Sequence, residues 1–306
     1  MGPTLPSAPE AHCARRCPTS RPLAPPQFLP HSASSTLASE NYNLSLADQK
    51  QRLTLPPCAQ PFPDPECFYY AYSPHPGWQF LVLDSYDVSL ARPRGSPGFA
   101  EAQRLLKAHN PNPCAWGEPD APGGNFFEGI RNTPASRFVP FNGGLGAAQL
   151  AWLRASLAQA RAAQQRVIVL SHVPFNPTSV CLYEPTVFST LMYNYEEVLE
   201  ALAPYAGSTV AAVFCGHNHG GSVGRDGAGI PHFTLPSPLI FPQGSHLVVD
   251  VFEGRLGLRA SGECANLVHP DVCPSHPTFP CVPHAPQPGR GLDLTPGGGL
   301  SLGASA

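Results

Sequence analysis

Apolar runs separated by polar turns predict several buried strands in the middle of the chain. Residues 166–172, RVIVLSH, and 208–217, STVAAVFCGH, are almost wholly apolar until their last positions. Such runs are typical of strands that are buried on both faces of a sheet. Residues 78–87, WQFLVLDSYD, predict a further strand that ends in acidic residues.

A second periodicity, with apolar residues three or four positions apart, predicts helices between these strands. In residues 147–165, leucines recur at 150, 153 and 157 among alanines, which favours an amphipathic helix. Residues 187–206 predict a second helix, and residues 230–236 and 245–260 predict later strands with a hairpin. Helices that alternate with buried strands indicate a layered α/β domain.

Proline is concentrated at both ends of the chain and separates them from this pattern. The sequence has 306 residues and 39 prolines. We expect a folded domain over residues 41–262, between low-complexity segments 1–40 and 263–306 that we expect to be disordered.

Charge and hydropathy exclude several classes of partner. Charged residues make up 13% of the chain and its net charge is −3, with no basic stripe, so we expect no nucleic-acid partner. No run approaches the ~18 apolar residues that a membrane helix needs. The leader has no apolar core, so we expect that it is not a secretory signal and that the protein is cytoplasmic. The leader's Ser, Arg and Pro content favours an organelle as the alternative. We also expect a monomer.

Three histidines follow the two apolar strands. His172 and His217 come directly after them, and His219 follows one residue later. A lone histidine there is more often structural, but three at two successive strand ends favour a metal site. Strand ends are where α/β folds place their chemistry, and neutral imidazole suits Mn, Fe and Zn. Gly216 and Gly220–Gly221 leave space for a ligand.

The pairing of a strand-end Ser-His with Gly-His-x-His resembles the calcineurin-like metallophosphoesterases. Within them, the chain resembles the manganese-dependent ADP-ribose/CDP-alcohol diphosphatases over roughly residues 41–260. The stretches that carry the resemblance, in the family's order, are FYYAY (68–72), FLVLDSYDVS (80–89), KAHNPN (107–112), FVPFNGGLGAAQLAWL (138–153), VIVLSHVPFNP (167–177), VCLYEPT (180–186) and CGHNHGG (215–221).

This resemblance implies an α/β fold, a layered α-β-β-α sandwich. It also implies two divalent metal ions, with Mn preferred and Mg, Fe or Zn possible, that activate a hydroxide for attack on phosphorus. The substrate implied is a small nucleotide with a pyrophosphate bond, and no catalytic residue is expected beyond the metal ligands. The residues implied are His172 and His217 for one metal, His219 for the other, and Asn142, Gly143 and Gly144 for substrate binding.

The family's upstream motifs, Asp-x-His, Gly-Asp and Gly-Asn-His-Glu, are not intact in this sequence. The last of them aligns with Leu37–Glu40, so that Ala38 replaces the asparagine and Ser39 the histidine. The leader has no aspartate before Asp48. We therefore expect a sandwich that lacks its first strands and a metal site that lacks its carboxylates.

Two explanations are open. The chain is either a truncated or mis-spliced form of a complete enzyme, or a protein that has lost catalysis. The functions that follow are an impaired pyrophosphate hydrolase or, alternatively, a non-catalytic phosphoesterase-like binding module. A third alternative is another metallophosphoesterase, such as a protein phosphatase or a purple acid phosphatase.

The composition predicts the course of proteolysis. Limited digestion should remove the proline-rich ends first and leave a core of about residues 41–262, because low-complexity chain is the most accessible to proteases. Mass spectrometry of the fragments checks this. Early cleavage inside residues 147–217 would contradict the predicted layout.

Overall fold

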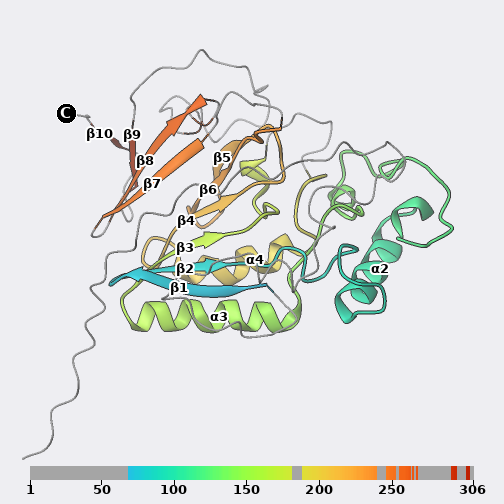
Figure 1. Cartoon of the computed structure of the whole chain (residues 1–306), viewed down its shortest axis with the longest axis horizontal. Helices are drawn as coiled ribbons and strands as arrows, with labels where there is room; N and C mark the ends of the chain where they lie inside the picture. The colour runs from blue at the N-terminus through green and yellow to red at the C-terminus, as the bar shows by residue number, and fades with distance from the viewer. Residues whose placement is uncertain are drawn as a thin grey trace, which may run out of the picture. The chain divides into compact units, whose positions relative to one another are not determined.

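A six-stranded sheet forms the centre of the molecule (Figure 1). The structure is a computed structural model that describes residues 68–180, 188–239, 246–252, 255–262, 264, 267, 291–294 and 301–303. The strand order is β1-β2-β3-β4-β6-β5. The strands are β1 (Tyr70–His75), β2 (Trp78–Val82), β3 (Arg166–Leu170), β4 (Val210–Cys215), β5 (Ser222–Arg225) and β6 (Pro231–Thr234).

The four middle strands, β2, β3, β4 and β6, run parallel, and the edge strands β1 and β5 pair antiparallel with their neighbours. The apolar runs of the sequence produce these middle strands because both faces of the sheet are covered. In the register of β3 with β4, Leu170 lies opposite Phe214. The two strands therefore end at the same edge of the sheet.

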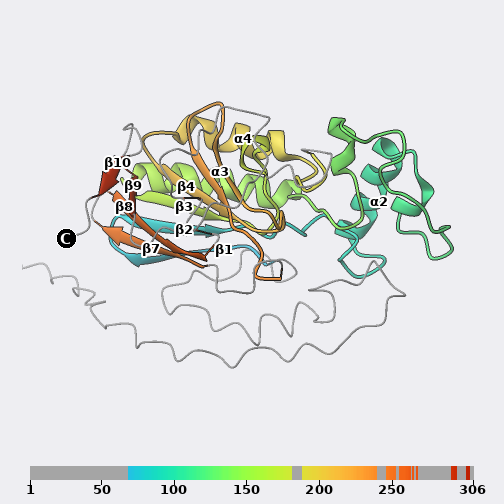
Figure 2. The same ribbon diagram turned by 90° about the horizontal axis from the view of Figure 1, so that it is seen from above.

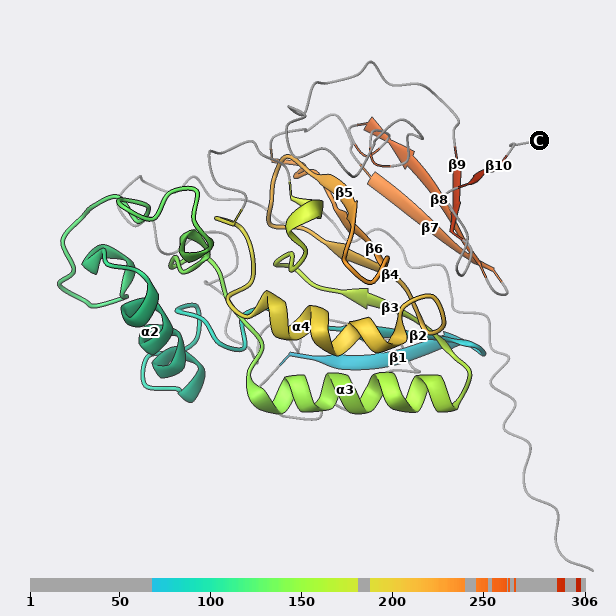
Figure 3. The same cartoon turned by 180° about the vertical axis from the view of Figure 1, so that it is seen from behind.

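Two helices cover one face of this sheet, as seen in Figure 3. They are α3 (Ala147–Ala162) and α4 (Tyr195–Leu202), which continues into the short 3-10 helix η4 (Ala203–Tyr205). Leu153 and Leu157 of α3 are fully buried against β3 and β4. The leucine spacing in the sequence therefore marks the side of α3 that packs on the sheet.

A second sheet covers the opposite face. Its order is β10-β9-β8-β7, and β7 (His246–Phe252) and β8 (Arg255–Ser261) form the antiparallel hairpin that the sequence predicts. Leu256 and Leu258 pack with Ile168, Phe214 and Phe233 of the first sheet. The short strands β9 (Gly291–Leu294) and β10 (Ser301–Gly303) extend this sheet. Helices, first sheet and second sheet thus form three successive layers, which confirms the predicted layered α/β architecture. The described residues show the α-β-β part of the expected α-β-β-α sandwich.

One helix lies away from these layers. In Figures 1 and 2, α2 (Pro97–His109) lies beyond the end of the sheet. Ser96 caps it by accepting a hydrogen bond from the backbone N–H of Phe99, and Pro97 occupies its first turn. The loops contain three short 3-10 helices. Two lie between α2 and α3, η1 (Pro113–Ala115) and η2 (Pro134–Arg137), and one between β3 and α4, η3 (Pro177–Ser179). In the described part of the chain, no helix combines the length and hydrophobicity that a membrane span requires.

The second predicted helix is shorter than expected. Of residues 187–206, residue 187 lies outside the described residues, and α4 begins only at Tyr195. The preceding residues are turns because their backbone N–H groups bond to other segments. Met192 donates to the carbonyl of Pro174, and Tyr193 to that of Gly143. Tertiary contacts therefore replace the first turns of this helix.

The predicted N-terminal domain boundary falls in a part of the chain that the structure does not describe, and the C-terminal one lies at the end of the described range 255–262. Segment 1–40, which includes the aligned tetrad Leu37–Glu40, lies outside the described residues. The same holds for residues 41–67 and for those of 263–306 other than the positions given above. These boundaries and the expected lack of the first strands stay predictions.

The buried face of α3 gives a test of the core. Leu153→Ala should lower the free energy of unfolding by about 2–5 kcal/mol, because Leu153 is fully buried and its removal leaves a cavity. Arg154→Ala, on the exposed side of the same helix, should change it by less than about 0.5 kcal/mol. Urea denaturation of both variants measures the difference. Equal effects would show that the helix does not pack as described.

Candidate functional site

Two of the predicted histidines lie side by side because their strands are neighbours. His172 follows β3 and His217 follows β4, two residues beyond its last residue. Their ring centroids are 5.2 Å apart, and the ring planes meet at 68°. The backbone N–H of Gly216 donates to the carbonyl of His172 at 2.9 Å, which ties the two strand ends together. The parallel sheet therefore brings together residues that are far apart in the sequence.

The backbone at His217 is in the left-handed region, with φ of 64°. A residue with a side chain rarely adopts this conformation outside turns and functional sites. Here the turn is closed by the N–H of Asn218, which donates to the carbonyl of Gly216 at 2.7 Å. The N–H of Ser237 then donates to the carbonyl of His219. These bonds fix the direction in which the His217 side chain leaves the loop.

His217 has an unusually low pKa. Burial of its ring is the main cause, and the neighbouring His172 and His219 contribute through charge repulsion, so that the pKa falls to about 3. His219 is two residues further along the same loop. At neutral pH the His217 imidazole is therefore uncharged and keeps one nitrogen lone pair, which is the form that binds a metal ion or accepts a proton.

The loop that follows β2 supports both histidines. The hydroxyl oxygen of Ser85 accepts hydrogen bonds from the backbone N–H groups of His172 and Val173, at 3.0 and 3.1 Å. The same hydroxyl lies 2.9 Å from that of Ser171. Ser85 therefore holds the backbone of the Ser-His motif at the end of β3.

The next residue of this loop, Tyr86, packs beside the imidazoles. Its ring centroid lies 5.8 Å from that of His172 and 6.5 Å from that of His217. The ring centroid of Phe141 lies 6.1 Å from that of His217. Aromatic rings therefore flank the histidine pair.

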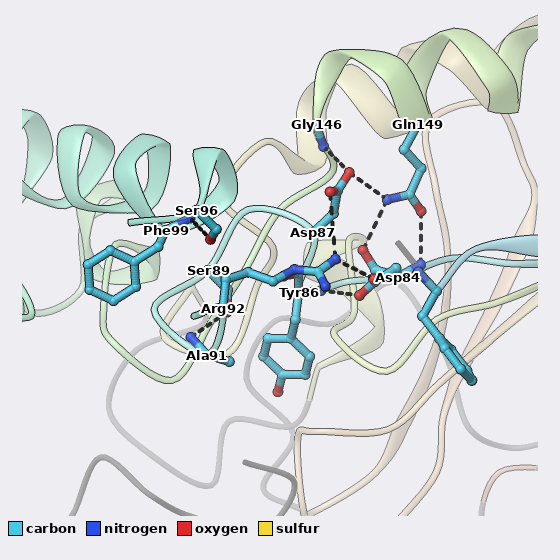
Figure 4. Close-up of polar contacts among 11 residues, drawn as sticks. Asp84, Tyr86, Asp87, Ser89, Ala91, Arg92, Ser96, Phe99, Gly146 and Gln149 are labelled. Carbon is cyan, nitrogen blue, oxygen red and sulfur yellow. Dashed lines mark hydrogen bonds and ion pairs between the residues drawn. The ribbon is translucent and has the colours of Figure 1, made fainter. Parts of the chain in front are cut away.

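Two acidic residues hold the loop in place, as Figure 4 shows. Asp84 forms an ion pair with Arg92 at 2.6 Å and accepts hydrogen bonds from the backbone N–H groups of Phe68 and Tyr86. Arg92 also donates to the carbonyl of Tyr86. Burial nevertheless raises the pKa of Asp84, and Arg92 is the strongest influence in the opposite direction. Asp84 thus has a structural role: it holds the loop after β2 in place.

Asp87 links the loop to the start of α3. Its carboxylate accepts hydrogen bonds from the N–H of Gly146, which is the N-cap of α3, and from the side chain of Gln149, at 2.9 and 3.0 Å. A negative charge at the first turn of a helix stabilises it. The ring of Tyr86 points away from both carboxylates (Figure 4). Asp84 and Asp87 are therefore engaged in holding the loop.

The predicted substrate-binding stretch lies buried beneath the loop. Asn142, Gly143 and Gly144 are all buried, and Asn142 Oδ1 lies 2.7 Å from His217 Nε2. A Cβ atom on Gly143 would lie 2.2 Å from the carbonyl oxygen of Ser85, so only glycine fits there. The stretch packs directly against the residues that position the histidines. Its assignment to substrate binding stays a prediction.

The described residues do not complete a two-metal centre. Among them, no three His, Cys, Asp or Glu side chains are arranged to hold a metal ion. Neutral imidazole suits a first-row divalent ion, but two such ions also need carboxylates for charge and geometry. Asp84 and Asp87 are occupied by Arg92, Gln149 and backbone N–H groups. The metal-ligand assignment of His172, His217 and His219 therefore also stays a prediction.

The layered fold corresponds to that of a known class of phosphatase. The crystal structure of a dimetal phosphatase from Danio rerio matches the chain with a TM-score of 0.54 and 32% identity, over 64% of this chain and 58% of that one. The described part of the chain has the metallophosphoesterase fold, and the predicted fold class is confirmed. No protein-family model matches the chain.

Curated proteins narrow the similarity to manganese-dependent ADP-ribose/CDP-alcohol diphosphatases, which confirms the predicted resemblance. The one from Oryza sativa subsp. japonica is 38% identical over 206 residues, which are 66% of this chain and 59% of that protein. Those from Arabidopsis thaliana and Danio rerio are 34% and 31% identical, over 62% and 66% of this chain and 56% and 58% of theirs. The chain thus spans somewhat more than half the length of these relatives.

The buried ion pair gives a test of the loop. Arg92→Leu should lower the free energy of unfolding by about 3–5 kcal/mol near neutral pH, because it leaves Asp84 ionised, buried and uncompensated. A carboxyl whose pKa is raised by folding costs stability above that pKa, and the cost disappears as the pH falls below it. The loss should therefore be smaller at a mildly acidic pH than at neutral pH.

Arg104→Leu is the matched control, since the Arg104–Glu101 pair is exposed. It should leave the free energy of unfolding nearly unchanged at either pH, because an exposed ion pair is screened by solvent. Urea denaturation at both pH values measures the two variants. A loss for Arg92→Leu that grows as the pH falls would contradict the described environment of Asp84.

Proposed function

We propose that this chain is a metal-dependent phosphohydrolase of the ADP-ribose/CDP-alcohol diphosphatase type. Its reaction is hydrolysis of the pyrophosphate bond in a small molecule linked to a nucleoside diphosphate. The observation that carries the proposal is the contact of His172 with His217 at adjacent parallel strand ends, inside a fold shared with a dimetal phosphatase. The names of the relatives support manganese as the preferred ion, with Mg, Fe or Zn as alternatives.

The proposal includes low turnover by this chain. The described residues bring imidazoles together but place no carboxylate with them in a metal-binding group. In the sequence, Ser39 aligns with the family's upstream histidine, which the resemblance implies to be the proton donor to the leaving group. Loss of general acid catalysis is typically worth ~10²–10⁴ in rate, and loss of carboxylate ligands lowers metal occupancy in addition.

A non-catalytic binding module is the second candidate. The observation that favours it is the engagement of both loop acids: Asp84 pairs with Arg92, and Asp87 bonds to Gly146 and Gln149. These acids are not available to a metal ion unless the loop rearranges. Such a module is expected to bind a nucleotide and release it unchanged, so calorimetric binding without product formation distinguishes it from an enzyme.

Hydrolysis of ADP-ribose with manganese tests the proposal. The unmodified chain should release AMP at a rate at least ~10² below that of a chimera whose residues 1–40 are replaced by a segment with the three upstream motifs. His217→Ala in the chimera should abolish the restored rate, because it removes one of the paired imidazoles. Chromatography quantifies the AMP that each of the three proteins releases over time.

His75→Ala in the same chimera is the control, since His75 is an exposed histidine of β1, outside the site. It should leave the rate unchanged. If the chimera is inactive, or if its activity survives His217→Ala, the proposed hydrolase site is wrong. If the unmodified chain is as fast as the chimera, the inference of low turnover is wrong.

A further inference from the structure

The side-chain amide of Asn142 has only one possible orientation. Asn142 is fully buried, and its Nδ2 lies 2.8 Å from the carbonyl oxygen of Arg137 and 2.9 Å from that of Ser189. Carbonyl oxygens only accept hydrogen bonds, so the NH₂ group must face them. A flipped amide would set an oxygen against two oxygens and lose both bonds.

This orientation decides which nitrogen of His217 carries the proton. With the NH₂ group committed, Asn142 presents Oδ1 to His217 Nε2 at 2.7 Å. An amide oxygen accepts and cannot donate, so Nε2 must be protonated for this bond to form. In a neutral imidazole the other nitrogen, Nδ1, then keeps its lone pair.

The His217 ring has little freedom to escape this arrangement. Rotating it by half a turn would place a carbon atom against Asn142 Oδ1 and leave a buried acceptor without its hydrogen bond. The rings of His172, Tyr86 and Phe141 lie around it, with centroids 5.2 to 6.5 Å away. The left-handed backbone conformation of His217 also fixes the direction of its Cα–Cβ bond, from which the ring extends.

We propose that Asn142 is a positioning residue that holds His217 in the Nε2–H tautomer and leaves Nδ1 as its ligand nitrogen. The tautomer follows from the geometry alone, while the use of Nδ1 toward a divalent cation rests on the proposed function. Residues that bond to the second nitrogen of a metal-binding histidine commonly set its tautomer and orientation. Asn142 thus acts on the reaction through His217, from beneath the site.

Nuclear magnetic resonance of the full chain tests this without metal or substrate. Long-range ¹H–¹⁵N spectra of the ¹⁵N-labelled protein near neutral pH distinguish the protonated nitrogen of each imidazole, and His217→Gln assigns the His217 signals by their disappearance. We expect a protonated Nε2 and an unprotonated Nδ1. Asn142→Ala should lower the ratio of the two tautomers on the order of tenfold, the effect of one lost hydrogen bond.

Asn110→Ala is the matched control. Asn110 is equally buried, and its Nδ2 also donates to two backbone carbonyls, those of Phe126 and Phe138, but its amide is bonded to residues 112, 126 and 138 and not to His217. It should lower the melting temperature as Asn142→Ala does and leave the His217 tautomer unchanged. A general loss of packing would change both variants alike.

The inference is overturned if wild-type His217 is protonated on Nδ1. It is also overturned if folded Asn142→Ala keeps the wild-type tautomer, or if Asn110→Ala changes the tautomer as much. If Asn142→Ala does not fold, the wild-type spectrum still decides. Because no activity is measured, failure of the hydrolysis experiment leaves this result standing, and an opposite tautomer leaves the proposed hydrolase reaction standing.

Discussion

The parallel pairing of β3 with β4 is the constraint on which the site depends. Each strand is followed by a histidine, and their register ends both strands at one edge of the sheet. The pairing exists because both strands are apolar on both faces and are covered by α3 and α4 on one side and by the β7–β8 hairpin on the other. Packing that has no chemical role therefore decides where the imidazoles meet.

The loop after β2 converts this proximity into a defined arrangement. Ser85 bonds to the backbone at His172, and Tyr86 packs beside both imidazole rings. Asp84 and Asp87 attach the loop to Arg92 and to the start of α3. The carboxylates near the site are thus used to hold the support of the histidines, which is a mechanical role and not a chemical one.

The sequence predicts β2, β3, β4, β6, the β7–β8 hairpin, α3 and the contact of His172 with His217, because each depends on a local pattern or on one rule about parallel sheets. It does not predict the edge strands β1 and β5. It predicts too long a second helix, since the N–H groups of Met192 and Tyr193 bond to segments whose proximity no local pattern reveals. The helix α2 was not predicted, although Ser96 followed by Pro97 is a recognisable start. The roles of Ser85 and Tyr86 were also missed, because a serine or tyrosine in a loop carries no signal of its partner. Asn142 is singled out in the sequence only as part of the expected substrate-binding stretch, and its bond to His217 becomes visible only in three dimensions.

The bonds that shape the histidine pair join residues distant along the chain: Ser85 with His172 across 87 positions, and Asn142 with His217 across 75. Closing such long loops costs entropy before any contact repays it, so bonds of this kind form late when a chain folds. The imidazole pair should therefore take shape only after the sheet has assembled, and its ring signals would report the last stage of folding. A polypeptide that ends before β4 lacks His217 and so cannot form the imidazole pair, whatever the rest of its fold.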